Sequence, residues 1–448
     1  MSQISLNAIE DANLMKVSEL WNLGYNGTGV VVAVFDNGIN FDHEALAGQN
    51  YGNPVLFNEV DEQTYNPCKV HGTPVAGLIA STGAGAYATT LGTAFGSKIV
   101  DMQMGCDGAN LIGDPIAGFD WLASQNDTIQ IVNLSWGAGT GLIFEEIINR
   151  LTKLGIVVVV SAGNDNQNVE FTLMDPATAI GSIAVGAVTD ALVPIGFSAM
   201  GPNSKYIAKP DIVAPGAGLT TLDANGGITY FTGTSGSAPL VSGAIATLIS
   251  GLEDQNIPWN VGTIKAGLMR SVTALPYDEL KVGQGFVNLN ATWEYLMNAP
   301  RDERGPMVLE ITPTKGPYSL YKSFPMDSVG YIPISIIASH PDLVNIEITG
   351  NLSQIISQQF QLNSDYSQIV YLQANTTGLS EGWYTGFINA SIGNDYVLSE
   401  FSISISGKPT QKVLLDLRHT NWDLSNSNNI GGTNIGEMIK LAQSKGIW

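Results

Sequence analysis

Three short stretches contain residue types that could perform nucleophilic catalysis at a carbonyl. Ser235 lies in "GTSGSAP", His71 opens "HGTPVAGLIAS", and Asp36 ends the apolar run "GVVVAVFD". A serine hydroxyl becomes an effective nucleophile when a histidine accepts its proton and a carboxylate orients the imidazole. The helix-like pattern that begins at Ser235 also supplies backbone N–H groups, which favour developing negative charge. The three side chains together would therefore suit acyl transfer.

Each of these stretches alone also admits a structural interpretation. Asp36 begins an Asp-Asn-Gly sequence that is typical of a plain turn. A lone histidine such as His71 is usually a satisfied surface or core group. The small residues around Ser235 would also allow a helix to pack closely against its neighbour. When each stretch is considered alone, a catalytic role and a purely structural role both remain open.

The surrounding pattern predicts an α/β architecture, with a parallel sheet, for a first domain at residues 1–300. Runs rich in β-branched residues are apolar on both faces, as strands of a helix-covered parallel sheet are. Helix-like stretches alternate with them. Asp36 would then end a strand, where open α/β sheets place their catalytic groups. The predicted strands span 29–36, 129–135, 155–163 and 182–188, and the predicted helices span 71–81, 114–125, 142–155 and 235–250.

The pattern changes after residue 300. The sequence "RDERGP" at 301–306 is interpreted as a charged linker. Short alternating strands separated by turn residues predict an all-β sandwich domain of the immunoglobulin or fibronectin type at 301–408. Residues 409–448 contain one strand-like and one helix-like segment. We expect them to be the β-α beginning of a truncated third domain.

The composition of the 448 residues argues against several classes of protein. The formal net charge is −21, so few cationic side chains could neutralise phosphates and nucleic acid is not expected as a partner. The hydrophobic content of 44% suffices for a large core and argues against disorder. No run predicts a membrane span, and the N-terminus lacks a signal-peptide pattern.

The motifs together, in their order along the chain, resemble those of the subtilisin-like serine proteases, the subtilase family. The matching stretches are "DNG", "HGTPVAG", "SAGN" and "GTSGSAP", with "KPDIVAPG" and "GQGFVNLNATWEYL" as further landmarks. The Asp, His, Ser order is that of subtilisin. The resemblance covers roughly residues 15–300. It implies a hydrolase that acts as a serine endopeptidase through an acyl-enzyme.

The resemblance also implies roles for individual residues. Ser235 would be the nucleophile, His71 the general base and then acid, and Asp36 the group that holds the imidazole tautomer. Asn164 in "SAGN" would donate a side-chain hydrogen bond to the oxyanion, alongside the backbone N–H of Ser235. His43 is the only other histidine of the predicted catalytic domain, and we interpret it as structural.

A polypeptide substrate would lie as an extended strand between two segments of the enzyme. By resemblance these are "GCDGAN", with Gly105 and Gly108, and "LSWGAG", with Ser135, Trp136 and Gly137. The second segment would form one wall of the pocket for the residue before the scissile bond. Trp136 has an alternative interpretation as a core aromatic residue.

Two further positions bear on the site. Asp165 follows Asn164 and is expected near the floor of the same pocket, which would favour basic or polar substrate side chains. Gly236 stands directly after Ser235, where relatives most often carry Met. This departure predicts weaker packing behind the nucleophile and insensitivity to peroxide at that position.

The two cysteines suggest a compartment. By resemblance Cys68 and Cys106 lie side by side and form a disulfide, and the alternative is two free buried thiols. A disulfide would favour an oxidising compartment, so we expect an extracellular or cell-surface protein. Such enzymes are usually made with an N-terminal propeptide, which is expected here and absent from this chain.

No cofactor is expected for catalysis. Structural Ca²⁺ would be compatible with the acid-rich loops, but no loop shows convincing ligand spacing, so no metal ligands are assigned. Two other functions stay open. One is a narrow-specificity processing protease. The other is a non-catalytic surface or binding protein in which the β-sandwich is the working part.

Overall fold

The computed structural model describes the chain in seven segments. They span residues 8–57, 68–104, 113–139, 144–166, 170–312, 323–357 and 362–407. The predicted third domain at 409–448 lies outside them.

The centre of the α/β unit is a seven-stranded sheet in which every strand pairs in parallel. The strand order is β2-β3-β1-β4-β5-β6-β7, so β1 lies between β3 and β4 and the winding reverses there. Asp36 stands at the carboxyl end of β1, which is the switch point where such sheets bind ligands. The strands are β1 (Val31–Asp36), β2 (Val55–Leu56), β3 (Lys98–Gln103), β4 (Ile131–Leu134), β5 (Val157–Ser161), β6 (Ile183–Val188) and β7 (Ile212–Pro215).

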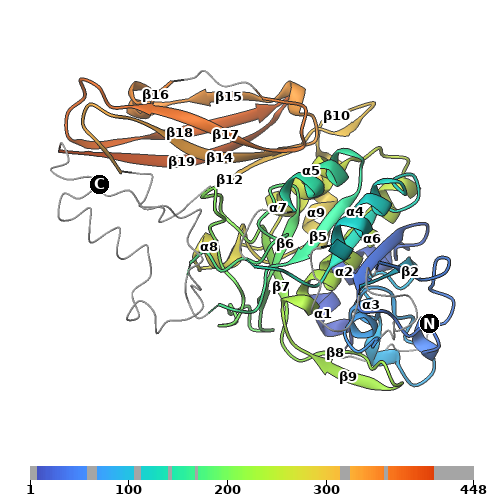
Figure 1. Cartoon of the computed structure of the whole chain (residues 1–448). Helices are drawn as coiled ribbons and strands as arrows, with labels where there is room; N and C mark the ends of the chain where they lie inside the picture. The colour runs from blue at the N-terminus through green and yellow to red at the C-terminus, as the bar shows by residue number, and fades with distance from the viewer. Residues whose placement is uncertain are drawn as a thin grey trace, which may run out of the picture.

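Helices cover both faces of this sheet, which confirms the predicted fold class (Figure 1). One face packs against α3 (Gly72–Ala80) and α6 (Thr234–Asp254), and the other against α4 (Gly113–Ala123) and α5 (Glu145–Lys153). The first face also carries α1 (Ala8–Leu14), α2 (Val17–Asn22), α7 (Val261–Arg270) and α9 (Leu289–Asn298), while α8 (Glu279–Val282) lies between α7 and α9 in the sequence.

Glycines let α3 and α6 approach their neighbours closely. A Cβ atom on Gly243 of α6 would collide with Oγ1 of Thr93, and one on Gly77 of α3 would lie 2.6 Å from Oγ1 of Thr221. The small-residue pattern of these helices therefore has a packing role in addition to any chemistry at their N-termini.

The C-terminal part of the described chain is a β-sandwich, in agreement with the predicted all-β architecture. Its two four-stranded sheets have the orders β12-β14-β17-β16 and β13-β19-β18-β15, and apolar side chains from both sheets fill the space between them. The strands are β12 (Leu309–Thr312), β13 (Ser323–Pro325), β14 (Val329–Ala338), β15 (Asn345–Ile348), β16 (Ile356–Ser357), β17 (Ser367–Asn375), β18 (Gly382–Ile392) and β19 (Asp395–Ser406).

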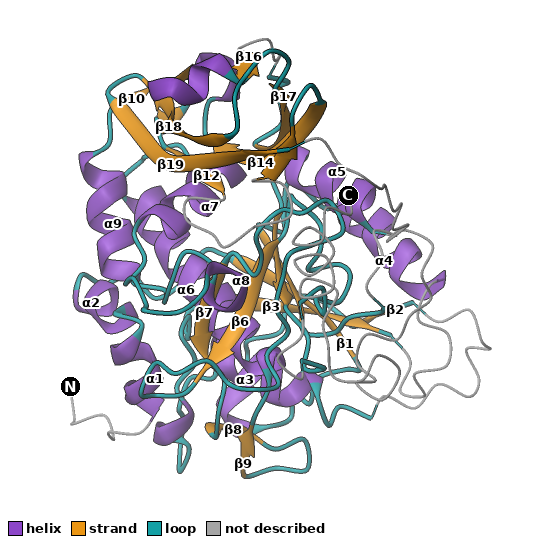
Figure 2. Cartoon of the chain, turned by 90° about the vertical axis from the view of Figure 1, so that its left-hand side faces the viewer, coloured by secondary structure: helices purple, strands orange, loops and turns teal. Residues whose placement is uncertain are grey.

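The sandwich lies against one end of the α/β unit, with α7 close below β12 (Figure 2). Nδ2 of Asn260 donates a hydrogen bond of 3.0 Å to the carbonyl of Ser339. The hydroxyl of Tyr295 in α9 donates one of 2.6 Å to Oδ2 of Asp395. Polar contacts therefore join the two parts beside the apolar packing of α7.

The predicted charged linker at 301–306 is instead a short hairpin of β10 (Arg301–Asp302) and β11 (Gly305–Pro306). Arg304 at its turn forms ion pairs with Asp302 at 3.2 Å and with Asp342 at 3.0 Å. The segment is ordered by a contact to a distant part of the chain, which a run of charges does not reveal.

One helix in the described part of the chain, α6, is long and apolar enough to cross a membrane by length and composition alone. However, 94% of the relevant window is buried inside the α/β unit, where α6 packs along the central sheet. Its apolar character is explained by this core position.

Candidate active site

Asp36 and His71 form a bonded pair at the carboxyl end of β1. Nδ1 of His71 lies 2.9 Å from Oδ2 and 3.0 Å from Oδ1 of Asp36. Asp36 is buried, whereas 34% of the His71 side chain is exposed. The imidazole is therefore held from the protein side while part of the ring reaches the solvent.

The Asp-Asn-Gly sequence after β1 also positions the helix that His71 opens. Oδ1 of Asn37 accepts hydrogen bonds from the backbone N–H of Gly72 at 3.0 Å and of His71 at 3.3 Å, at the start of α3. A Cβ atom on Gly72 would collide with the carbonyl of Gly38. The turn interpretation and the chemical interpretation of this stretch are thus compatible, because the same turn carries Asp36 and caps α3.

The environment of His71 raises its pKa above the ordinary value of 6.5. Burial lowers the pKa of the imidazole, but the charge of Asp36 and the hydrogen bond to it together raise it by more. Asp36 therefore stabilises the imidazolium, which is the state that a general base reaches after accepting a proton.

Ser235 lies in the first turn of α6, and a proline explains how its backbone is held. Pro239 lacks the N–H that would bond to the carbonyl four residues earlier, which is that of Ser235. The hydroxyl of Ser135 donates to this carbonyl instead, at 3.0 Å. A residue that follows β4 therefore clamps the backbone of Ser235 in place.

A buried chain of hydrogen bonds supports this clamp. Nδ2 of Asn133 donates to Oγ of Ser135, and Oγ of Ser242 donates to Oδ1 of Asn133, each at 2.9 Å. Asn133 and Ser242 are both fully buried. The chain thus returns to α6, two turns beyond Ser235. Asn133 and Ser242 could not be assigned to the site from local sequence, because they are 109 residues apart in the chain.

The hydroxyl of Ser235 donates a 3.0 Å hydrogen bond to the backbone carbonyl of Ser135. Within the described segments no hydrogen bond joins it to His71. Catalytic hydrogen bonds are often long or absent without substrate and form in the substrate complex. Phe231, four residues before Ser235, contacts the His71 ring with centroids 5.2 Å apart, so the two helix starts meet at this phenyl group.

Asn164 is tied to the residue before the serine. Its Oδ1 accepts hydrogen bonds from the backbone N–H of Thr234 at 2.9 Å and from the Thr234 hydroxyl at 3.0 Å. The side chain is exposed, and its Nδ2 makes no hydrogen bond to any described residue. With the oxygen engaged, the amide N–H₂ group is available as a donor beside the start of α6.

The space behind the nucleophile is filled, so the expected weaker packing at Gly236 is wrong. A Cβ atom on Gly236 would lie 2.5 Å from Cδ1 of Leu219 and 3.3 Å from Cδ1 of Phe231. These two residues belong to the hairpin of β8 (Leu219–Leu222) and β9 (Ile228–Phe231). The hairpin occupies the position that a larger side chain would take.

A second buried carboxyl group lies one strand away from Asp36. Asp101 on β3 is paired with Val34 of β1, and its Oδ2 accepts a hydrogen bond from the backbone N–H of Ile39 at 3.2 Å. Its Oδ1 has no hydrogen-bond partner among the described residues. Burial raises the pKa of Asp101 to about 6, with the charge of Asp36 adding to the rise against the hydrogen bonds that Asp101 accepts.

His43 is buried away from the chemistry. Its Nε2 lies 3.0 Å from the carbonyl of Gly227 in the β8–β9 turn, its Nδ1 accepts from the N–H of Ala45, and its ring packs on Tyr87. These contacts give His43 a structural position, joining two loops.

Trp136 packs toward the core. Its ring lies 5.8–6.2 Å from those of Phe35, Phe119 and Phe144. This contact accounts for the bulk of the indole, and a role in the pocket wall stays a prediction.

Other predicted residues of the site lie outside the described segments. They are Gly105, Gly108 and Cys106, so one side of the predicted substrate cleft and the predicted disulfide stay predictions. Cys68, on the other side of that disulfide, is partly buried just before α3.

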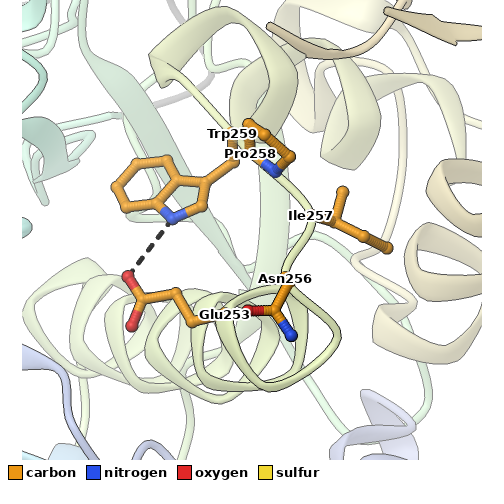
Figure 3. A pocket seen from close by; sticks show the side chains of 5 residues that line it. All are labelled: Glu253, Asn256, Ile257, Pro258 and Trp259. Atoms are coloured by element: carbon orange, nitrogen blue, oxygen red, sulfur yellow. Dashed lines mark hydrogen bonds between the residues drawn. The ribbon is translucent and has the colours of Figure 1, made fainter. Parts of the chain in front are cut away.

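A shallow pocket of about 430 Å³ lies at the other end of α6 from Ser235 (Figure 3). Glu253, Asn256, Ile257, Pro258 and Trp259 line it, and Nε1 of Trp259 donates to Oε1 of Glu253 at 3.4 Å. It is separate from the residues described above. Among the described residues no group of three or more His, Cys, Asp or Glu side chains could hold a metal ion.

A family model and individual relatives both place this chain in the same protein family. The model of the subtilase family matches residues 27–287, more than half of the chain. The chain is similar to subtilisin from Bacillus pumilus, with 29% identity over 280 residues that cover 62% of this chain and 95% of the relative. It is also similar to alkaline elastase YaB from Bacillus sp. (strain YaB), with 32% identity covering 60% of this chain and 65% of the relative. The major intracellular serine protease of Bacillus subtilis (strain 168) is 30% identical, covering 63% and 88%.

Proposed function

Because the chain belongs to the subtilase family and is a serine endopeptidase, we propose that Asp36, His71 and Ser235 are its catalytic triad. The observation that carries this proposal is the bond of Nδ1 of His71 to both carboxylate oxygens of Asp36. It leaves Nε2 as the nitrogen that faces the reacting groups. In this assignment Asp36 fixes the tautomer and stabilises the imidazolium.

The reaction then follows from the positions of these groups. His71 Nε2 accepts the proton of the Ser235 hydroxyl as its oxygen attacks the peptide carbonyl, and later gives the proton to the leaving amine. Binding of substrate has to release the Ser235 hydroxyl from the carbonyl of Ser135, its acceptor in the free protein. Water hydrolyses the acyl-enzyme in the second half of the reaction.

The negative charge on the attacked oxygen would be met by two donors. One is Nδ2 of Asn164, whose oxygen is held by Thr234. The other is the backbone N–H of Ser235 in the first turn of α6, where N–H groups have no partner within the helix. The oxygen of Asn164 is bonded to Thr234 and the carbonyl of Ser235 to Ser135, which supports donors fixed before substrate arrives, as stabilisation of a developing charge requires.

The test uses a fluorophosphonate probe and peptide hydrolysis in parallel. We expect the purified protein to be labelled and to cleave peptides, and Ser235→Ala to do neither. Ser237→Ala is the matched control, because its hydroxyl is bonded to the carbonyls of Ala214 and Pro215 and lies in the same helix turn. Labelling or cleavage that survives in Ser235→Ala would refute the proposal. A wild type that binds a ligand through its sandwich without being labelled would favour the binding-module alternative.

We also propose the disulfide between Cys68 and Cys106, and with it an extracellular location. The described part of the chain contains no free thiol, and Cys68 stands three residues before His71. Closing a loop of this kind would stabilise the fold by about 3–4 kcal/mol. Peptide mapping by mass spectrometry without reduction should give one linked peptide, and two alkylated cysteines would exclude the bridge.

A further inference from the structure

Two glycines near Ser235 face the same side chain. A Cβ atom on Gly137 would lie 2.6 Å from Cβ of Met174. One on Gly163 would lie 2.7 Å from Cγ and 3.0 Å from Sδ of Met174. The Met174 side chain therefore lies between the segment after β4 and the segment after β5, in contact with the bare backbone of both.

Both segments adjoin the proposed nucleophile. Gly137 follows two residues after Ser135, whose carbonyl accepts the hydrogen bond of the Ser235 hydroxyl. Gly163 directly precedes Asn164, and its backbone N–H donates to the hydroxyl of Thr234 at 3.1 Å. With Ser235 as the proposed nucleophile, the space between the two segments would adjoin the scissile bond of a bound peptide.

The backbone of Met174 and Asp175 is hydrogen-bonded to both segments. The N–H of Met174 donates to the carbonyl of Ala162 at 3.1 Å. The carbonyl of Asp175 accepts from the N–H of Ala138 at 2.8 Å. The two consecutive residues Met174 and Asp175 therefore bridge the two segments through backbone hydrogen bonds. Leu173 and Asp175 on either side are buried, whereas Met174 is partly exposed.

We propose that Met174 is a specificity-determining residue that fills the pocket for the substrate residue before the scissile bond. The inference rests on the proposed function and names its substrate class: peptides with glycine, alanine or serine at that position. The glycines leave both walls without side chains, but Met174 takes up the room between them. Asp165, which the sequence led us to expect near the pocket floor, is exposed, whereas Met174 contacts both glycine-bearing segments.

A large aromatic or branched residue could enter only if Met174 moved. Methionine is flexible, so the proposal requires that the contacts with Gly137 and Gly163 keep the side chain in place. Occupied space discriminates by size: even one methylene group too many or too few in an apolar pocket changes kcat/KM by roughly 10–200-fold.

The experiment compares kcat/KM for tetrapeptide p-nitroanilides that differ only in the residue before the scissile bond, alanine or phenylalanine. We expect the wild type to prefer alanine by about tenfold or more. Met174→Gly and Met174→Ala should each shift the ratio toward phenylalanine by at least about tenfold. Met174→Leu should keep the wild-type preference because it keeps the volume, and so should Met269→Ala, which removes a buried methionine of α7.

The possible outcomes distinguish failure of the proposed role of Met174 from failure of the proposed catalytic triad. A wild type that is labelled by fluorophosphonate yet prefers phenylalanine overturns the role of Met174 and leaves the triad standing. The same holds if both small variants are labelled and keep the wild-type ratio. A wild type that is not labelled overturns the triad and the pocket assignment together.

Discussion

The two faces of the central sheet differ sharply at the carboxyl ends of β1 and β4. On the face toward α3 and α6 stand Asp36 and Ser135, each with hydrogen-bond partners from distant parts of the chain. On the face toward α4 and α5 their sequence neighbours Phe35 and Trp136 join a cluster of aromatic rings. Consecutive residues therefore have different roles: Asp36 and Ser135 form hydrogen bonds in the candidate site, whereas Phe35 and Trp136 pack against other aromatic rings.

The difference shows what each face contributes. The aromatic face is held by buried apolar area and by edge-to-face ring contacts. The polar face is held by directional bonds, and each buried donor or acceptor that loses its partner costs free energy. Changes on the polar face should therefore lower both stability and catalysis, whereas changes on the aromatic face should lower stability and leave catalysis largely unchanged.

The largest effect is expected from Asp36→Asn. An amide cannot stabilise the imidazolium or fix the tautomer, so kcat should fall by roughly 10⁴-fold, as in other serine triads. The pKa of His71 should fall, because the charge and hydrogen bond of Asp36 hold it above its ordinary value. NMR titration of the imidazole in a Ser235→Ala background measures this shift.

In the wild type, the raised pKa of His71 sets the direction of the pH dependence. The base must be neutral to accept a proton, so kcat/KM should rise with pH through a midpoint above 6.5. Asp165→Asn, which removes an exposed carboxylate near Asn164, is the control. A His71 pKa that responds equally to both substitutions would contradict the pairing with Asp36.

Next in size is Gly243→Ala, compared with Gly118→Ala on the other face. An added methyl group would collide with Oγ1 of Thr93 in the first case and with the ring of Phe35 in the second. Each overpacked site should lose about 1–3 kcal/mol of stability in urea unfolding. Only Gly243→Ala should also lower kcat, by up to roughly 10²-fold, because α6 carries Ser235. An equal loss of kcat per active site in both variants would contradict the expectation that only the face toward α6 affects catalysis.

Asn133→Ala tests the buried hydrogen-bond chain. It leaves the hydroxyl groups of Ser135 and Ser242 without their shared partner, at a cost of roughly 1–3 kcal/mol. Since Ser135 clamps the Ser235 carbonyl, kcat should fall while KM changes little. Leu134→Val, one residue along and on the aromatic face, should lose stability without this loss of kcat. Matching kcat losses in the two variants would argue against the clamp.

The smallest effect is expected from Asp101→Asn. The folded pKa of Asp101 is about 6, above its ordinary 3.8, so the folded state holds its proton more tightly than the unfolded state does. Wild-type stability should therefore fall, relative to the variant, as pH rises from about 4 to about 6. We expect a difference on the order of 1–2 kcal/mol, measured by urea unfolding at the two pH values. A constant difference would show that Asp101 does not titrate in this range.

Much of this could be predicted from local sequence. The doubly apolar runs predicted four of the seven parallel strands, β1, β4, β5 and β6, and the four motifs predicted the family. The hairpin at Arg304 was missed because its ion-pair partner Asp342 lies far away in the sequence. The filled space at Gly236 was missed because Leu219, which fills it, belongs to a hairpin that the sequence did not reveal.

The sequence by itself determined the α/β class, the β-sandwich and the family to which the chain belongs. These depend on periodicity and on short motifs, which local residues carry. The tertiary structure alone decided that Ser135 replaces the helix donor missing at Pro239, and that Met174 lies between Gly137 and Gly163. Such pairings join strand ends and helix starts that are distant in sequence, and only the packing of the sheet brings them within contact distance.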